Sequence, residues 1–240
     1  MAKRRGSRRP FGKEMMPGLR LQGRTAWTEN ATPGQDVYGE TLRRGGLEEW
    51  RRWDPRRSKL GAGLVRTENE EISLLPKAGS RVLYLGAGHG TTVSHLHDIV
   101  CGADNHRGGR LVAVDLAPRC LRDLNHLARS RPGLIPLLAD ARKHSMIAAL
   151  MPYRADWLFQ DVAQASQVDI FLNACERFLR TGGLGLFSLK AASERWDGEG
   201  ERALFDKVAT RLSESGLELV ENIELAGFEE HHMLFVCRMV

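Results

Sequence analysis

The stretch VLYLGAGHGTTVSHLHD, residues 82–98, decides the fold class of this chain. An apolar run ends at Leu85, three glycines follow at positions 86, 88 and 90, and a Thr-Thr pair then opens an amphipathic segment. Glycine allows a tight turn after a strand, and it lets a ligand approach the backbone where a Cβ atom would collide. The unpaired N–H groups of the following helix add hydrogen-bond donors at the same place. This unit of strand, glycine loop and helix predicts a ligand site at the end of a strand.

Strand-like apolar runs alternate with helix-like segments from residue 81 onward. The runs are apolar throughout, which is typical of parallel strands covered by helices on both faces. A helix is expected over 199–215, and the strand-like segments 217–225 and 231–240 then predict an antiparallel hairpin at the edge of the sheet. The other expected strands span residues 81–85, 110–115, 134–139, 155–161 and 183–190, and the other expected helices span 91–100, 118–130, 142–151 and 165–180.

The first quarter of the chain has a different pattern. Residues 1–14 are basic and rich in glycine and arginine with no apolar run behind them, so we predict a disordered tail and no secretory signal. Short segments punctuated by Gly, Pro, Asn and Asp predict a small β-rich domain over residues 15–54. Apolar residues at intervals of three and four then predict a helix over 56–75. Residues 55–240 form the predicted main domain.

Charge and cysteine content narrow the class of protein. A net charge of +5, with arginine-rich stretches at 3–9, 42–57 and 129–143, favours an anionic partner, of which nucleic acid is the commonest. The four cysteines stand singly, which argues against a disulfide framework or a zinc site and favours a reducing compartment. No run approaches the roughly 18 apolar residues of a membrane span, so we predict a cytoplasmic protein.

Three aspartates end three successive predicted strands: Asp115, Asp140 and Asp161. Because the carboxyl ends of parallel strands meet at one edge of a sheet, we expect these side chains to line one crevice. Asp115 is placed to accept hydrogen bonds from the ribose hydroxyls of an adenosine, and Asp140 to reach an adenine amino group. The dinucleotide signature GxGxxG is incomplete, and three carboxylates disfavour a pyrophosphate but favour a cationic sulfonium. The residues therefore indicate S-adenosylmethionine and a class I methyltransferase-like domain, with an NAD oxidoreductase as the alternative.

Several longer motifs carry a resemblance to a known family. They are PGQDVYGE (33–40), WDPRRSKLGAGL (53–64), the glycine-loop stretch quoted above, PLLADAR (136–142), QDVAQ (160–164) and SLKAAS (188–193). Together they resemble fibrillarin in its archaeal form, from about residue 18 to residue 240. The resemblance implies an S-adenosylmethionine-dependent RNA 2′-O-methyltransferase of the box C/D ribonucleoprotein, in which a guide RNA selects the target ribose in rRNA or tRNA. It also implies an α/β fold, with a Rossmann-like domain built on a seven-stranded, mostly parallel sheet behind a small β-rich N-terminal domain.

Four catalytic residues carry over from the motifs of the family. Lys59 stands in RSKLGA, Asp161 in DVAQ and Lys190 in SLKA. The histidine of the C-terminal motif corresponds to His232 in FEEHHM, although His231 stands where the family usually has aspartate, so both histidines stay open for this role. We expect burial and the neighbouring Lys59 to lower the pKa of Lys190, which would then accept a proton or stabilise the developing alkoxide.

The cofactor contacts carry over in the same way, as four groups around the methionine part, the ribose, the adenine and the sulfonium. In that order the residues are Gly86, Ala87, Gly88, Thr91 and Thr92; Asp115 and Leu116; Asp140 and Ala141; and Asp161 and Gln164. Asp115 replaces the glutamate that is common in the family. The loop GAGHG also differs from the commoner GAASG, and we interpret His89 as a residue that fills the loop.

The resemblance also implies partners for this protein. They are a Nop-type scaffold protein, a kink-turn-binding ribosomal-type protein, box C/D guide RNA and target RNA. Arginines just before the first catalytic lysine are expected to contact RNA phosphates, namely Arg51, Arg52, Arg56 and Arg57.

Two other functional classes stay open at this point. One is a methyltransferase of the same fold that acts on protein glutamine or on a stand-alone RNA, and the other is a non-enzymatic assembly subunit of a ribonucleoprotein. We predict no metal site, because His95 and His97 stand two residues apart on a helix and so face different directions.

Overall fold

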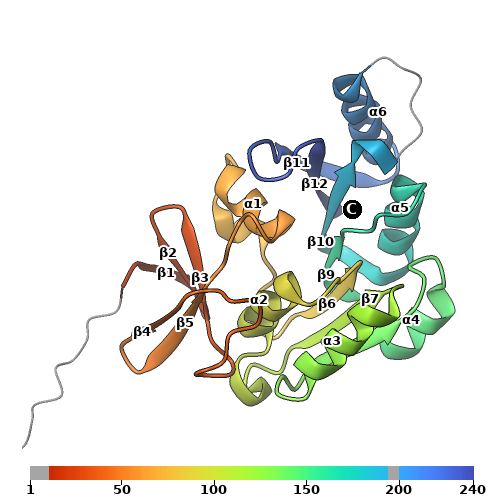
Figure 1. The fold of residues 1–240 in the computed structure, drawn as a ribbon. Coiled ribbons are helices and arrows are strands. Elements are labelled where there is room, and N and C mark those ends of the chain that lie inside the picture. Colours follow the sequence, from red (N-terminus) through yellow and green to blue (C-terminus); the bar gives the residue numbers. More distant parts are fainter. Residues whose placement is uncertain (1–10, 194–199) are drawn as a thin grey trace, which may run out of the picture.

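The computed structural model describes residues 11–193 and 200–240, and it contains two sheets that lie side by side (Figure 1). The smaller sheet is antiparallel, with the strand order β1-β2-β3-β5-β4. Its strands are β1 (Lys13–Met16), β2 (Leu19–Gln22), β3 (Thr25–Glu29), β4 (Leu42–Gly45) and β5 (Glu48–Arg52). Residues 1–10 of the predicted tail lie outside the described residues. The prediction of disorder is wrong for Lys13 and Glu14, which pair with β2.

The larger sheet has seven strands in the order β11-β12-β10-β9-β6-β7-β8. Its strands are β6 (Arg81–Leu85), β7 (Arg110–Asp115), β8 (Leu134–Leu138), β9 (Ala155–Gln160), β10 (Leu179–Lys190), β11 (Leu217–Glu224) and β12 (His232–Met239). Strands β10, β9, β6, β7 and β8 are parallel, whereas β12 is antiparallel to both β10 and β11. The predicted seven-stranded, mostly parallel sheet with an antiparallel hairpin at one edge is therefore confirmed.

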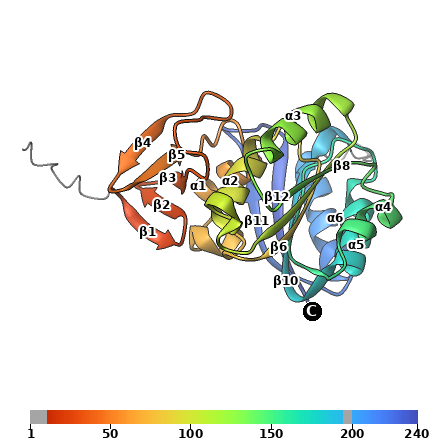
Figure 2. The same ribbon diagram turned by 90° about the horizontal axis from the view of Figure 1, so that it is seen from below.

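Helices cover both faces of the larger sheet (Figure 2). They are α1 (Lys59–Arg66), α2 (Thr91–Val100), α3 (Pro118–Ala128), α4 (His144–Leu150), α5 (Gln167–Phe178) and α6 (Glu201–Ser213). In β6, Val82 and Tyr84 pack with α1, α2 and α3, whereas Leu83 and Leu85 pack with α4, α5 and α6. Both faces of the strand are buried, which explains why it reads as one continuous apolar run. Within the described part of the chain, no helix has the length and apolar character needed to cross a membrane.

The predicted helix over residues 56–75 is wrong in its extent. It begins at Lys59, where the side chain of Ser58 caps it by accepting from the N–H of Gly61 at 3.0 Å, and it ends at Arg66. The next residues turn away because Glu221 of β11 accepts hydrogen bonds from the Thr67 hydroxyl and from the backbone N–H of Glu68. A short 3₁₀ helix then spans Glu71–Leu74. These tertiary hydrogen bonds override the apolar periodicity.

A buried ionic network joins the small sheet to α2. Arg51 of β5 donates from Nη1 to Oδ2 of Asp98 at 2.8 Å and from Nε to Oε1 of Glu40 at 2.5 Å. Arg131, just after α3, donates to Oδ1 of Asp98 at 2.6 Å. Burial opposes ionisation of Asp98, but the two guanidinium groups outweigh it and hold the pKa of this carboxyl well below its usual range. Two positive and two negative groups thus balance inside the protein.

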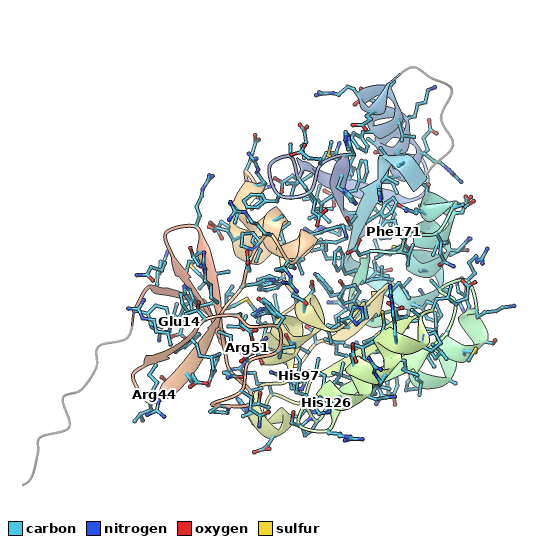
Figure 3. All side chains as sticks on the ribbon, viewed as in Figure 1. Glu14, Arg44, Arg51, His97, His126 and Phe171 are labelled. Carbon is cyan, nitrogen blue, oxygen red and sulfur yellow. The ribbon has the colours of Figure 1, made fainter. Side chains whose placement is uncertain are left out.

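The network corrects one of the expected RNA contacts. Arg51 has no exposed side-chain surface, and it lies at the junction between the small sheet and α2 (Figure 3). It cannot reach a phosphate in this position, so its assignment as an RNA contact is wrong. Arg52, Arg56 and Arg57 are exposed, and their contact with RNA stays a prediction.

Neutral groups complete the junction around Asp98. The Thr28 hydroxyl donates to Oδ2 of Asp98 at 2.8 Å, so it accepts from Nδ1 of His95 at 2.7 Å. With its proton on Nδ1, His95 has Nε2 left as an acceptor, and the hydroxyl of Tyr38 lies 2.7 Å from it. Burial, aided by the nearby Arg51, lowers the pKa of His95 well below its ordinary value and keeps the ring neutral. His95 therefore has a structural role at the junction between the small sheet and α2.

We expect Asp98→Asn to lower the free energy of unfolding by about 3–5 kcal/mol, because it leaves two buried guanidinium groups with one carboxylate. Chemical denaturation at neutral pH measures this change. Glu218→Gln is the control, since its ion pair with Arg238 lies at the surface, with side chains 61% and 48% exposed. That variant should lose less than about 1 kcal/mol. Equal and small losses in both variants would contradict the importance of the network.

Candidate active site

Two adjoining cavities meet at the glycine loop between β6 and α2. One, of about 610 Å³, lies beyond the carboxyl ends of β6, β7, β8 and β9, and the other, of about 680 Å³, lies between α2, α3 and the loop of residues 32–38. Gly86, Gly88 and Asp161 line both cavities. Every predicted cofactor residue except Asp140 lines at least one of them. The structure therefore brings the residues of the predicted cofactor site together.

Gly86 is required by the close approach of two backbone segments. Its φ is +81°, and a Cβ atom at this position would lie 2.3 Å from the carbonyl oxygen of Asp161. Gly88 also has a positive φ, of +59°, but a Cβ there would meet nothing within 4 Å. The first glycine thus allows β6 and β9 to end side by side, and the second leaves open space where a ligand can pass the loop.

The carboxylate of Asp115 is oriented by two backbone N–H groups. Its Oδ2 accepts from Gly88 at 2.7 Å, and its Oδ1 accepts from Ala117 at 2.8 Å. Each carboxylate oxygen has two lone pairs, so each keeps an acceptor site for a ligand hydroxyl. This geometry suits the predicted contact with a ribose.

Lys59 and Asp161 form an ion pair at the side of the cofactor cavity. Lys59 donates from Nζ to Oδ2 of Asp161 at 3.0 Å, and the two side chains are 22% and 20% exposed. The hydroxyl of Ser58, the cap of α1, lies 2.8 Å from the hydroxyl of Thr92 on the first turn of α2. This contact holds the start of α1, and with it Lys59, beside the glycine loop. Burial raises the pKa of Asp161, and the charge of Lys59 opposes that rise.

Lys190 and His232 face each other as register partners on β10 and β12. His232 is only 8% exposed and donates from Nδ1 to the carbonyl oxygen of Glu230 at 2.8 Å, which leaves Nε2 as the acceptor of the ring. The Asp161 carboxyl is close enough to interact electrostatically with this imidazole. These contacts favour His232 as the histidine of the site.

His231 points to a different group. Its φ is +61°, its side chain is 66% exposed, and its Nδ1 lies 2.6 Å from Oε1 of Glu201 on α6. The Glu201 carboxylate raises the pKa of His231. These contacts direct the side chain toward α6 rather than toward Asp161.

The expected burial of Lys190 is wrong. Its side chain is exposed at the end of β10, while its backbone N–H donates to Oε1 of Gln167 at 3.2 Å. Lys190 therefore lacks the burial on which its predicted role as a proton acceptor rested. An exposed ammonium is, however, free to meet an anionic ligand.

Two contacts near the cofactor loop were not predicted from the sequence, namely Arg142 with Asp140 and His89 with Asp123. The role of His89 was also interpreted incompletely. Arg142 binds the carboxylate of Asp140, which also explains why Asp140 does not line a cavity. His89 does more than fill the loop, because its Nδ1 lies 2.7 Å from Oδ2 of Asp123 on α3. The capping role of Ser58 was detectable, since serine directly before a helical pattern is a typical N-cap. The His89–Asp123 contact spans 34 residues and left no local signal.

Comparisons of the sequence with known proteins identify the family of this chain. Residues 19–240 match the Fibrillarin family. A fibrillarin-like rRNA/tRNA 2′-O-methyltransferase from Thermococcus onnurineus is 41% identical over 212 residues, which is 88% of each chain. A relative of the same name from Methanococcus voltae is 37% identical over 210 residues, or 87% of each chain.

Solved structures are similar as well. The Methanococcus jannaschii fibrillarin pre-rRNA processing protein has a TM-score of 0.81 and 32% identity, with 95% of this chain and 96% of that chain covered. An Aeropyrum pernix fibrillarin with natively bound S-adenosyl-L-methionine has a TM-score of 0.76 and 35% identity, with 88% of each chain covered. A fibrillarin from a complex with Nop5p has a TM-score of 0.81 and 31% identity, with 95% of this chain and all of that chain covered.

The seven-stranded sheet and the cavity at its carboxyl edge define a Rossmann-like methyltransferase of class I. The family match and the identities over most of the chain make the finer assignment, because they exceed what a shared fold alone produces. This chain belongs to the fibrillarin family.

We expect Gly86→Ala to destabilise the protein more than Gly88→Ala. Both substitutions place a side chain in the left-handed region at a cost of about 1–2 kcal/mol, but only the first drives a Cβ into the backbone of Asp161. Thermal and chemical unfolding measure the difference. Equal losses of stability in the two variants would mean that the carboxyl ends of β6 and β9 can separate at little cost.

Proposed function

We propose that this protein transfers a methyl group from S-adenosylmethionine to the 2′-hydroxyl of a ribose in rRNA or tRNA, at a nucleotide selected by a box C/D guide RNA. The observation that carries the proposal is the Lys59–Asp161 ion pair beside the cofactor cavity, with His232 within electrostatic range of the same carboxylate. The relatives named as rRNA/tRNA 2′-O-methyltransferases support it.

The cofactor cavity fits this donor. Its volume of about 610 Å³ falls within the usual range of small-molecule sites, and Gly88 keeps the loop open on the ligand side. Asp115 would hold the ribose, Ala141 and Asp140 the adenine, and Gly86–Gly88 with the Thr91-Thr92 pair the methionine part. When bound, S-adenosylmethionine supplies a reactive methyl group on a cationic sulfur. The carboxylates of Asp115 and Asp161 favour that positive charge, and they disfavour the pyrophosphate of NAD.

We assign the proton of the ribose hydroxyl to His232. Its Nδ1–H is committed to Glu230, so Nε2 has the free lone pair that a general base needs. The imidazolium that forms would be stabilised by the nearby negative charge of Asp161. Lys59 holds that carboxylate in place, which fixes the geometry before the proton moves.

Lys190 takes a different role in this scheme from the one that the sequence favoured. Because it is exposed, it is better suited to bind the RNA or the developing negative charge on the ribose oxygen than to act as a neutral base. The exposed Arg52, Arg56 and Arg57 lead along the chain toward Lys59, and we assign them to the phosphates of the guide–target duplex.

The partners follow from the same proposal. A solved fibrillarin is bound to Nop5p, and we propose a Nop-type scaffold protein as the partner of this chain. A kink-turn-binding protein and the guide RNA would complete the assembly. No observation favours a protein-glutamine methyltransferase or a non-enzymatic subunit.

The reaction is tested by reconstitution with guide RNA, the scaffold protein and the kink-turn-binding protein. We expect methylation of a target RNA to stop when the selected nucleotide alone lacks its 2′-hydroxyl, because the acceptor oxygen is gone. A target with the same change at the neighbouring nucleotide is the control and should be methylated normally. Continued methylation of the first target would refute the ribose as acceptor.

We expect Lys190→Ala to reduce turnover at least about 100-fold while S-adenosylmethionine binds with unchanged affinity. The reason is that the exposed ammonium would act on the RNA rather than on the cofactor. Lys77→Ala is the control, since this lysine is also exposed and lines neither cavity. Single-turnover kinetics and calorimetry separate the two effects. A parallel loss of cofactor affinity would instead place Lys190 in the cofactor site.

A further inference from the structure

The strands that lead to Asp161 and Lys190 stop pairing before the second of these residues is reached. The pairing of β9 with β10 ends at Gln160 and Phe187, whereas β10 stays paired with β12 as far as Lys190 and His232. Over the last residues of β10, strand β9 therefore no longer supplies hydrogen-bond partners. A backbone N–H that points to this side needs an acceptor from elsewhere.

A side chain of α5 supplies that acceptor. Oε1 of Gln167, the first residue of the helix, accepts from the backbone N–H of Lys190 at 3.2 Å. The backbone carbonyl oxygen of Gln167 accepts in turn from Nε2 of Gln160 at 2.7 Å. Because Gln160 directly precedes Asp161, these two hydrogen bonds connect the carboxyl ends of the two strands.

The burial of both glutamines shows that the contact is part of the core. Gln160 and Gln167 have no exposed surface, although glutamine is mostly found at the surface of proteins. An apolar side chain of similar length would fill the same space, but it could not accept a hydrogen bond from Lys190. The amide of Gln167 thus provides more than packing.

The position of Lys190 depends on its backbone. Its side chain is exposed, so packing contributes little to the place of its ammonium group. The N–H that Gln167 holds belongs to the same residue, directly beside the Cα atom that carries the side chain. A hydrogen bond at this point therefore fixes where the lysine starts.

We propose that Gln167 is a positioning residue that holds the end of β10 so that Lys190 meets the RNA at a fixed distance from Asp161. The inference rests on the proposed function, because it assumes that Lys190 acts on the target ribose. A misplacement of about 1 Å can cost a reaction about 100-fold in rate. Gln167 lines neither cavity, so its effect should not extend to cofactor binding.

The test measures single-turnover methylation by the reconstituted complex and the affinity of the chain for S-adenosylhomocysteine. We expect Gln167→Met to reduce turnover at least about tenfold with unchanged affinity, because it keeps the length of the side chain and loses the acceptor. Gln167→Asn should act in the same way, since its amide is too short to reach. Gln167→Glu keeps an acceptor at the same reach and should retain more turnover than either.

A double-mutant cycle separates positioning from a general structural role. If Gln167 acts through Lys190, Gln167→Met should cause little further loss in a chain that already carries Lys190→Ala. Amide hydrogen exchange gives a readout that does not depend on activity. The backbone N–H of Lys190 should exchange faster in Gln167→Met than in the wild-type protein, because its acceptor is gone.

Gln22→Met is the matched control. Gln22 is an exposed glutamine of β2 that lines neither cavity, so its substitution should leave turnover and the exchange of the Lys190 amide unchanged. Thermal unfolding checks that each variant is folded, and Gln167→Asn carries the test if Gln167→Met does not fold.

The outcomes separate this inference from the proposed function. Unchanged turnover in Gln167→Met, an equal loss in the Lys190→Ala chain, a parallel loss of S-adenosylhomocysteine affinity, or unchanged exchange of the Lys190 amide each overturns the role of Gln167. These results leave the proposed function standing. Failure of the wild-type complex to methylate its target overturns the proposed function, and the inference with it. Only a loss of turnover that depends on Lys190 supports the role assigned here.

Discussion

The active site depends on the burial of four charges between the small sheet and α2. Asp98 pairs with Arg51 from the small sheet and with Arg131 after α3, while Glu40 accepts from Nε of Arg51. Removing any one of these groups would leave a buried charge without its partner. The stability of the network therefore depends on all four groups. The same helix α2 begins at the cofactor loop. The network thus fixes the helix that follows the glycine loop, and this loop lines both cavities.

The net positive charge of the chain is concentrated in its first ten residues. The chain carries 35 basic and 30 acidic residues, and the first ten residues contain five basic residues and no acidic one. The remaining residues are therefore balanced, and the overall excess comes from residues 1–10. A balanced body has little general attraction for RNA. The proposed function therefore assigns the affinity to local groups such as Lys190 and the exposed arginines, and to partner proteins.

The sequence predicted the parts of the structure that leave a local pattern. Continuous apolar runs indicated the buried parallel strands, and the glycine loop with Asp115 and Asp161 indicated the ligand site. Arg51 was misplaced because an arginine in a basic stretch resembles a surface residue, and its partner Asp98 stands 47 residues away. Lys190 was misplaced for a related reason. Its position after an apolar strand suggested burial, although the last residue of a strand can point to solvent.

The order of strands in the larger sheet has a consequence for biosynthesis. β12 lies between β10 and β11, so a ribosome has to release residues 232–239 before the sheet can close. The Lys59–Asp161 pair already spans 102 positions of the chain, and His232 joins it later still. A growing polypeptide would therefore possess most of its donor pocket while lacking the histidine that we propose as the base. If His232 is the base, as we propose, the chain gains activity only after β12 is inserted between β10 and β11.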